Sequence, residues 1–288
     1  QYTGPVFRYE MSRPEANGQF TQIGAELLGS SGISADAEVL GLAAQVLSKA
    51  EVADWRLQLA DLDVLNSVLD AVGVSERARN FIVDSVPKLK QGHHVIPQVL
   101  EEAHRLHLTE QYANEDCLVE AVQGLDDSQS RVVLRGLLKW NAADQLGQRS
   151  AEEVVDRLLR KLRGSDEIRT LQRGLELASA LAVIRGEPEE SLAGVEAVIR
   201  ASDAKPEAFE RLSQLLALVL SDPIIGDHLE LDFGLVRGLA YYNGIVFEAT
   251  HSSWPESLGG GGRYDGLAKA LGSRDVIPAL GFAYNLEA

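Results

Sequence analysis

The sequence has little cysteine, a shortage of positive charge and no long apolar run. Its single cysteine, Cys117, excludes a disulfide framework and is typical of a reducing, cytoplasmic setting. Lys and Arg number 27 against 43 Asp and Glu, a formal net charge of −16. This balance argues against binding of nucleic acid or of an anionic membrane, which both need a cationic face. No apolar run approaches the roughly 18 residues of a membrane span.

What the sequence does contain is the composition of an ordinary folded protein, with 45% hydrophobic and 24% charged residues among 288. Three textures follow one another. Residues 1–35 are glycine-punctuated and strand-like, roughly 75–222 carry helical apolar stripes, and glycine-broken strands return from His228. We divide the chain accordingly into 1–75, 76–225 and 226–288. We therefore expect an α+β fold in which the two outer parts form one core and the middle is a helical insertion with connecting helices. Because the chain begins with Gln1, we also expect it to continue at both ends.

Local patterns predict the elements of this fold. Alternating apolar and polar residues at 6–10 and 20–27 favour an antiparallel hairpin. Ser34 and Asp36 have the chemistry to cap a helix that starts near Ala37. Further strands are expected at 55–59, 230–233, 244–248 and 278–283, and helices at 37–49, 61–72, 95–107, 150–162, 166–184, 206–220 and 264–271.

Gln22 and Glu26 are a first pair of candidate binding residues. They lie four apart on a strand-like run, so both side chains point to the same face. Such a pair suits a small molecule with an amino group and an N–H donor. The alternative is a polar pair that satisfies itself inside the sheet.

The segment 235–248 is the densest group of chemically capable residues, with Arg237, Tyr241 and Tyr242 between strand-like runs. Arg237 can bind a carboxylate or a phosphate through its planar guanidinium. The alternative is a simple hairpin with a half-buried tyrosine pair. The glycine run Gly259–Gly262 can cradle an anion with its backbone N–H groups, although it lacks a Walker ending and a flexible turn is the simpler interpretation.

Metal binding and nucleophilic catalysis have little support. His104 and His107 are three apart on an expected helix without a third convergent ligand, and we expect a solvated face there. His93 and His94 have no identifiable partner, and Cys117 lacks a histidine or asparagine to activate it.

The motifs together resemble the catalytic core of the histidyl-tRNA synthetases, which are class II synthetases. Residues 7–10 and 20–26 are similar to the second class II motif, and 235–248 to the histidine-binding signature. Residues 260–267 and 278–283 are similar to the closing glycine motif and the start of the third class II motif. The resemblance implies a class II synthetase-like antiparallel sheet core with a helical insertion. It also implies a histidine-binding site made of Arg8, Gln22, Glu26, Arg237, Tyr241, Tyr242 and Tyr264.

In that site, the resemblance implies that Gln22 and Glu26 face the α-amino group and the imidazole of histidine, with Arg237 on the carboxylate side. Tyr242 and Tyr264 would line the ring. The sequence also departs from the synthetase pattern. The loop 11–19 has only Arg13, Ala240 replaces an aspartate, and Ala288 follows Glu287 where an arginine is expected. Because adenylation stabilises charge on a phosphoryl group, the loss of cationic clamps removes its main catalytic term.

A retained amino-acid site without adenylation chemistry is similar to the family's non-catalytic paralogues, the regulatory subunits of ATP phosphoribosyltransferase. This resemblance implies a cytoplasmic homodimer within a hetero-oligomer. It would activate a short-form catalytic subunit and mediate feedback inhibition by L-histidine in the first step of histidine biosynthesis. We expect no catalytic residue, cofactor, metal, nucleic acid or membrane. The alternatives are a functional histidyl-tRNA synthetase core and another histidine-sensing pseudo-synthetase.

Overall fold

The fold was taken from a computed structural model, which describes residues 1–7, 18–109, 125–141, 152, 154–156, 159, 166–235 and 241–287. Arg8, Arg237 and Cys117 lie outside these residues. The strands are β1 (Tyr2–Phe7), β2 (Gln19–Leu28), β3 (Trp55–Asp61), β4 (Arg185–Gly186), β5 (Leu229–Asp232), β6 (Ile245–His251), β7 (Trp254–Arg263) and β8 (Ala279–Asn285). The helices are α1 (Ile33–Lys49), α2 (Leu62–Val72), α3 (Glu76–Leu89), η1 (His93–Val95), α4 (Ile96–Arg105), α7 (Asp127–Asn141), α9 (Ile168–Ala182), α10 (Pro188–Ser202), α11 (Glu207–Val219), α12 (Pro223–Gly226) and α13 (Leu267–Ala270).

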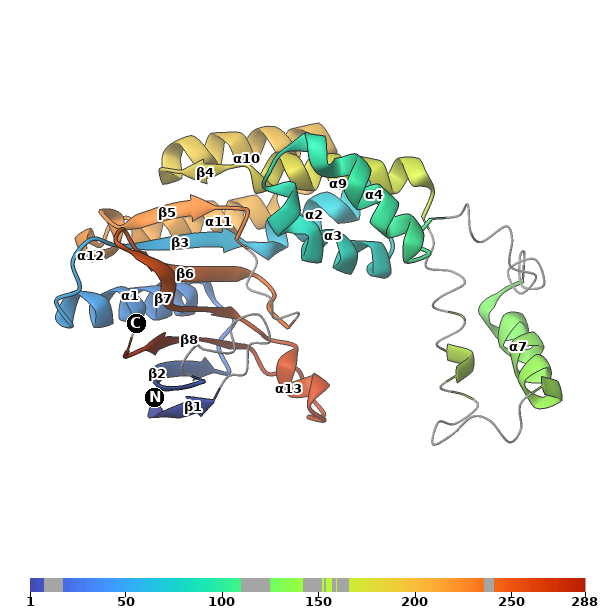
Figure 1. The fold of residues 1–288 in the computed structure, drawn as a ribbon, viewed down its shortest axis with the longest axis horizontal. Helices are drawn as coiled ribbons and strands as arrows, with labels where there is room; N and C mark the ends of the chain where they lie inside the picture. Colours follow the sequence, from blue (N-terminus) through green and yellow to red (C-terminus); the bar gives the residue numbers. More distant parts are fainter. Residues whose placement is uncertain are drawn as a thin grey trace.

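The strands form one sheet of eight in the order β1-β2-β8-β7-β6-β3-β5-β4 (Figure 1). All neighbours are antiparallel except β3 and β5, which run parallel. The predicted hairpin is confirmed, because Tyr2–Phe7 pairs in register with Gln19–Gly24. The expected α+β class is also confirmed, with a mostly antiparallel sheet and helices packed on it. The two outer parts of the chain meet in this sheet, where β2 pairs with β8.

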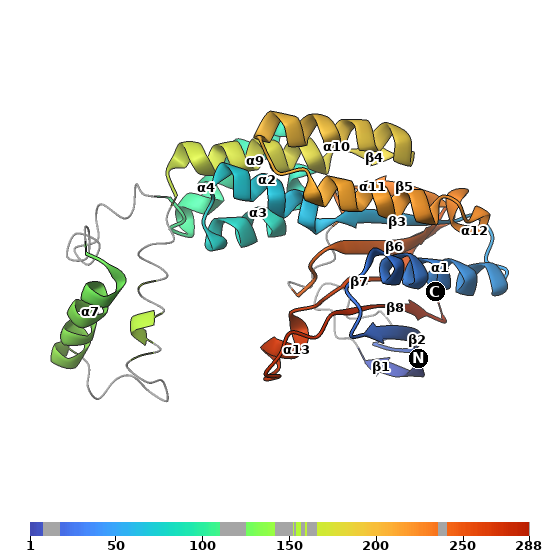
Figure 2. The same cartoon turned by 180° about the vertical axis from the view of Figure 1, so that it is seen from behind.

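One face of the sheet carries the hydrophobic core. Apolar side chains that alternate along the central strands, such as Leu57, Leu59 and Phe247, are fully buried. They pack in one cluster with residues of α1, α2, α3, α9 and α11. Figure 2 shows α1 and α11 in front of the strands on this side. Because strand side chains alternate, the polar residues of the same strands point to the opposite face.

The start of helix α1 differs from the expectation that Ser34 and Asp36 cap it. Helix α1 begins at Ile33, with Gly32 as its N-cap and no side-chain cap. Asp36 is not a cap: it lies inside the helix, is 1% exposed and binds arginines instead. Helix α2 has an ordinary side-chain N-cap, because the side chain of Asp61 accepts a hydrogen bond from the backbone N–H of Asp63 at its start. At its end, Gly73 adopts φ 79°, a left-handed conformation that favours glycine.

The middle of the chain is more closely joined to the sheet than its helical texture suggests. It contains β4, a strand that periodicity misses because it is two residues long and pairs with β5. Helices α9, α10 and α11 share the main core with the sheet. Helix α7, in contrast, lies away from the sheet in both views (Figures 1 and 2), and Leu134 packs with Val155 and Leu159 in a separate small cluster. The division into 1–75, 76–225 and 226–288 stays a prediction. No helix among the described residues has the length and apolar character needed to cross a bilayer.

Candidate functional site

The predicted polar pair, Gln22 and Glu26, lies on the face of β2 that points away from the helices. This is the open face of the sheet. Gln22, Gly24 and Glu26 alternate with Ile23 and Ala25, which pack on the main core. Gly24 pairs with Tyr2 on β1. Because glycine has no side chain, the ring of Tyr2 lies across it; a Cβ there would be 2.5 Å from the Tyr2 hydroxyl. The hydroxyl accepts a hydrogen bond of 2.8 Å from Nε2 of Gln22.

The floor beside this pair is made of glycine backbone. Glu26 pairs with Gly281 on β8, which pairs with Gly262 on β7. A Cβ at Gly281 would collide with the Glu26 carboxylate and lie 2.5 Å from the carbonyl oxygen of Ala25. The glycine run Gly259–Gly262 is therefore neither a turn nor an anion cradle before a helix: it is part of β7, paired on both sides with β6 and β8. The prediction of a turn was wrong because strand periodicity cannot be read from residues without side chains.

Three tyrosines close the site. The Tyr264 hydroxyl donates a short hydrogen bond to Oε2 of Glu26. The rings of Tyr241 and Tyr242 lie 4.8 Å apart, and both meet Tyr264 edge-on with centroid distances of 6.0 and 6.4 Å. The hairpin interpretation of 235–248 is wrong, because β3 separates β5 from β6 in the sheet. Tyr242 is half-buried against Ala60 and Val246, whereas Tyr241 is 38% exposed.

The electrostatics of the site favour a cation. Burial, and then the hydrogen bond to Glu26, raise the pKa of the Tyr264 hydroxyl well above its usual range. Burial also raises the pKa of Tyr2, and Glu26 adds to this while the Gln22 amide opposes it. Both hydroxyls therefore stay neutral near pH 7, and each has a lone pair to accept with. Glu26 supplies the negative charge of the described site residues, and a ligand with positively charged N–H groups complements it.

A buried ion network holds the tyrosine-bearing segments in place. Arg263, which precedes Tyr264, is 3% exposed and points to the helix-covered face. Its Nε donates to Asp36 at 2.9 Å and its Nη1 to Asp265 at 3.0 Å. Arg211 of α11 binds the other oxygen of Asp36 at 2.6 Å.

The same network reaches the segment before β6. The backbone N–H of Asp265 donates to Oδ1 of Asn243 at 2.8 Å, and the backbone N–H of Asn243 donates to the carbonyl of Arg263 at 2.8 Å. These bonds fix Tyr242 and Tyr264 relative to each other. Arg263 and Arg211 form ion pairs with carboxylates on the helix-covered face of the sheet. They therefore bring no cationic group to the floor of the site.

Of the seven residues proposed from the sequence, the structure brings Gln22, Glu26, Tyr242 and Tyr264 together, with Tyr241 at the rim. Arg8 and Arg237 lie outside the described residues. Tyr2 is a site residue that the sequence patterns missed. Its signal was the register of the hairpin, which places it opposite Gly24.

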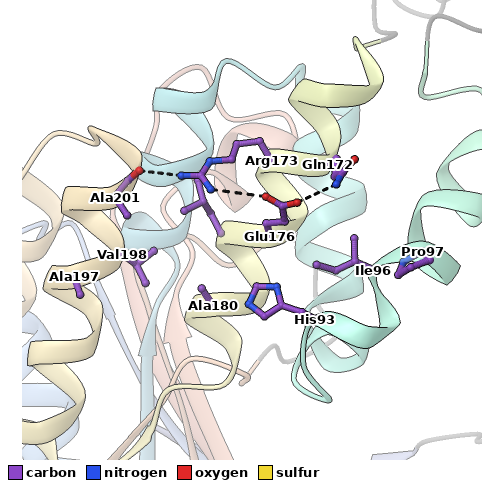
Figure 3. A pocket seen from close by; sticks show the side chains of 11 residues that line it. His93, Ile96, Pro97, Gln172, Arg173, Glu176, Ala180, Ala197, Val198 and Ala201 are labelled. Atoms are coloured by element: carbon purple, nitrogen blue, oxygen red, sulfur yellow. Dashed lines mark hydrogen bonds and ion pairs between the residues drawn. The ribbon is translucent and has the colours of Figure 1, made fainter.

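Two further hollows are lined by described residues. One, of about 540 Å³, is formed by α4, α9 and α10 (Figure 3). Its polar side chains satisfy one another, because Glu176 accepts from Gln172 and pairs with Arg173, which also donates to the carbonyl of Ala201. The other lies on the open face of the sheet, over β3, β5 and β6.

No three His, Cys, Asp or Glu side chains of the described ranges gather in a way that can hold a metal ion. His104 binds Thr109 through Nδ1.

Comparison with known proteins identifies the relatives of this arrangement. The model of the histidyl-tRNA synthetase family matches residues 1–130 and 130–288. The ATP phosphoribosyltransferase regulatory subunit of Halothermothrix orenii is 28% identical over 286 residues, covering 99% of this chain and 51% of that protein. The histidine–tRNA ligase of Sulfolobus acidocaldarius is 26% identical over 287 residues, covering 99% and 50%. The chain thus spans about half the length of the curated relatives it matches.

Solved structures agree on the fold. An ATP phosphoribosyltransferase regulatory subunit/histidyl-tRNA synthetase from Bacillus halodurans C superposes with a TM-score of 0.59 at 18% identity, covering 99% of this chain and 56% of the other. A histidyl-tRNA synthetase from Nostoc sp. PCC 7120 gives 0.55 at 14% identity, covering 99% and 51%.

Proposed function

The chain belongs to the histidyl-tRNA synthetase family, and from this premise we propose that it is a regulatory member that binds L-histidine and performs no aminoacylation. Its partner is a short-form catalytic subunit of ATP phosphoribosyltransferase, which it activates by assembly in a cytoplasmic hetero-oligomer. Histidine binding then lowers the activity of the complex, as feedback on the first step of histidine biosynthesis. The Halothermothrix orenii relative that bears this name, at 28% identity, supports the proposal.

The observation that carries the proposal is the charge of the site. Glu26 is the charged side chain among the described site residues, beside the Gln22 amide and the neutral hydroxyls of Tyr2 and Tyr264, and Arg263 is turned away and paired with Asp36. Such a site recognises a ligand with positively charged N–H groups. Adenylation instead needs cationic groups aimed at the phosphates. In the loop 11–19 of the sequence, Arg13 is the one basic residue.

Histidine fits the described geometry by its chemistry. Glu26 accepts from one N–H of the imidazole or from the α-ammonium group, and Gln22 supplies an amide beside it. The rings of Tyr242 and Tyr264, set at 70° to each other, bound a flat aromatic ligand on two sides. By the family resemblance, Arg237 is assigned to the carboxylate side and Arg8 is counted among the histidine-binding residues, which leaves Tyr241 to cover the entrance.

Inhibition follows if histidine prefers one of two states of the complex. A ligand shifts such an equilibrium only through its different affinity for the two states. Helix α11 carries this difference in the proposal, because Arg211 on it shares Asp36 with Arg263 beside the site. On this proposal, histidine orders Tyr264 and biases the helix-covered face through that shared carboxylate.

Two assays on one preparation test the proposal. Mixed with a short-form catalytic subunit, the chain should co-elute with it and raise the rate of phosphoribosyl transfer between phosphoribosyl pyrophosphate and ATP. Histidine-dependent exchange of pyrophosphate into ATP should be absent. A chain that neither co-elutes nor activates, across several catalytic subunits, contradicts the proposal.

The second candidate is a functional histidyl-tRNA synthetase core. It is favoured by the histidine–tRNA ligases that match at identities such as 26%, close to that of the regulatory subunit. A clear pyrophosphate-exchange signal that depends on histidine and disappears in Glu26→Gln would establish this candidate in place of the first.

A further inference from the structure

A second pocket, of about 770 Å³, lies on the same open face of the sheet as the candidate histidine site. Its floor comes from β3, β5 and β6, and the turn between β6 and β7 forms a wall. These strands lie beyond β8 and β7 as seen from β2, so the pocket is several strands from Glu26 (Figure 1). Its volume is within the range of small-molecule sites.

Gln58 is the central residue of the floor. It is 8% exposed, and it lines the pocket from the middle of β3. Within the described parts of the chain, its side-chain amide makes no hydrogen bond. Its amide atoms still reach the pocket, because Arg79 Nε is the one fully buried side-chain nitrogen or oxygen atom of the described residues that has no hydrogen-bond partner. An amide that no described protein group satisfies, and that faces a pocket, is available to a ligand.

Carboxylates flank this amide on both sides. Gln58 pairs across the sheet with Glu230 on β5 and Glu248 on β6, so all three side chains share the open face. Two arginines, Arg56 and Arg185, also line the pocket, and each forms an ion pair with a carboxylate. Arg56 lies 3.6 Å from Glu230, and Arg185 lies 3.7 Å from the same carboxylate.

The lining as a whole is negative. Arg185 is also 3.6 Å from Asp232 behind the pocket, and Arg56 donates to a backbone carbonyl. The lining carboxylates outnumber the two guanidinium groups; they are Asp54, Glu230, Glu248 and Glu256. An anionic ligand such as a phosphate would meet this excess of negative charge, whereas a cation is attracted by it.

Trp254 indicates which kind of cation fits. It lines the pocket as the first residue of β7, directly after the turn from β6, and it is 47% exposed. An indole face stabilises ammonium and guanidinium groups by cation–π contact. The described carboxylates and imidazoles form no group with metal-ligand geometry. An organic cation with N–H donors satisfies the Gln58 carbonyl oxygen, the carboxylates and the indole together.

We propose that this pocket is a binding site for a small organic cation with an ammonium or guanidinium group on an aliphatic stem. The site is separate from the histidine site and independent of the proposed regulatory role. Its ligand donates N–H groups to Gln58 and Glu248 and places its cationic group against the indole face of Trp254.

Agmatine, which has a guanidinium and an ammonium group and no carboxylate, is the probe. Titrated calorimetrically into the whole chain at constant ionic strength, it should bind saturably at one site. Glu248→Gln should weaken binding at least tenfold, because a charge-assisted hydrogen bond becomes a neutral one. Gln58→Leu should weaken it to a similar extent and leave the melting temperature nearly unchanged, since no described protein hydrogen bond is lost with the amide. Glu207→Gln, the same charge change at an exposed position on α11, should alter affinity less than twofold.

Several outcomes overturn the proposal. One is the absence of saturable agmatine binding up to 10 mM, a range set for the assay. Another is equal weakening by Glu207→Gln, which would mean general attraction to an acidic protein. Saturable binding of inorganic phosphate that Gln58→Leu abolishes would assign the pocket to anions. Displacement of agmatine by histidine, or its loss in Glu26→Gln, would place it in the histidine site.

Discussion

Asp61 is the clearest case in which the structure predicts a change of stability with pH. It is 2% exposed at the start of α2 and accepts the backbone N–H of Asp63 at 2.9 Å. Burial, and then the charge of Asp63, raise its pKa from 3.8 to about 7. Asp61→Asn keeps an equally good N-cap and removes the group that titrates.

The sign and size follow from linkage. The unfolded chain releases this proton near pH 3.8, whereas the folded protein holds it until about pH 7. Between these values the folded state binds more protons, so its stability falls as the pH rises. Each pKa unit corresponds to about 1.4 kcal/mol. A shift of roughly three units therefore costs the native protein about 4 kcal/mol above pH 7, a cost absent below pH 4, and the asparagine variant does not bear it.

Urea unfolding of both proteins between pH 4 and pH 8 measures this difference. The free energy of unfolding of Asp61→Asn should exceed that of the native protein by an amount that grows with pH and levels off above about pH 7. Asp222→Asn, at the half-buried N-cap of α12, is the matched control. A difference that is flat across the range, or a variant less stable at pH 8, would refute the assignment of a buried, largely protonated Asp61.

Two further changes test the network and the floor of the site. Asp36→Asn removes the carboxylate that Arg263 and Arg211 share and leaves Asp265 as the remaining described carboxylate on the buried Arg263, so urea unfolding should show a loss of about 3 kcal/mol; a loss below about 1 kcal/mol would mean that the pair is not buried as described. Gly281→Ala places a methyl group 2.5 Å from a backbone oxygen and against Glu26, so calorimetry should show histidine affinity reduced by more than about tenfold. Gly266→Ala, with nothing within 4 Å of the new Cβ, should bind normally; equal affinities in the two variants would contradict the geometry.

Much of the fold was predictable because periodicity reports burial. The hairpin of β1 and β2, the strand from Trp55 and the helix that ends at Gly73 all follow alternation or capping rules that the structure confirms. The face shared by Gln22 and Glu26 followed from the two-residue repeat of a strand. The grouping of these residues with the tyrosines came from the resemblance to the synthetase family, since spacing within one segment contains no information about another.

The remainder depends on tertiary contacts that no local pattern records. In the central strand β7, Gly259, Gly261 and Gly262 need to be glycine because neighbouring atoms approach too closely for a Cβ. Asp36 is a residue type that often caps helices, but here it forms an ion pair with Arg263, which is 227 positions away in the sequence. The parallel pairing of β3 with β5 and the pocket around Gln58 likewise arise where segments distant in sequence meet.

The central claim is that Glu26 belongs to the histidine sensor of a regulatory subunit. It is tested most directly by the rate of phosphoribosyl transfer by a short-form catalytic subunit, measured with increasing histidine in the presence of this chain or of Glu26→Gln. Glu38→Gln, an exposed carboxylate on α1, is the control. We predict activation by all three proteins, inhibition by histidine with the native chain and the control, and an inhibition constant for Glu26→Gln at least about tenfold higher. Equal inhibition of all three complexes, or the same rate with and without the chain, would contradict the claim.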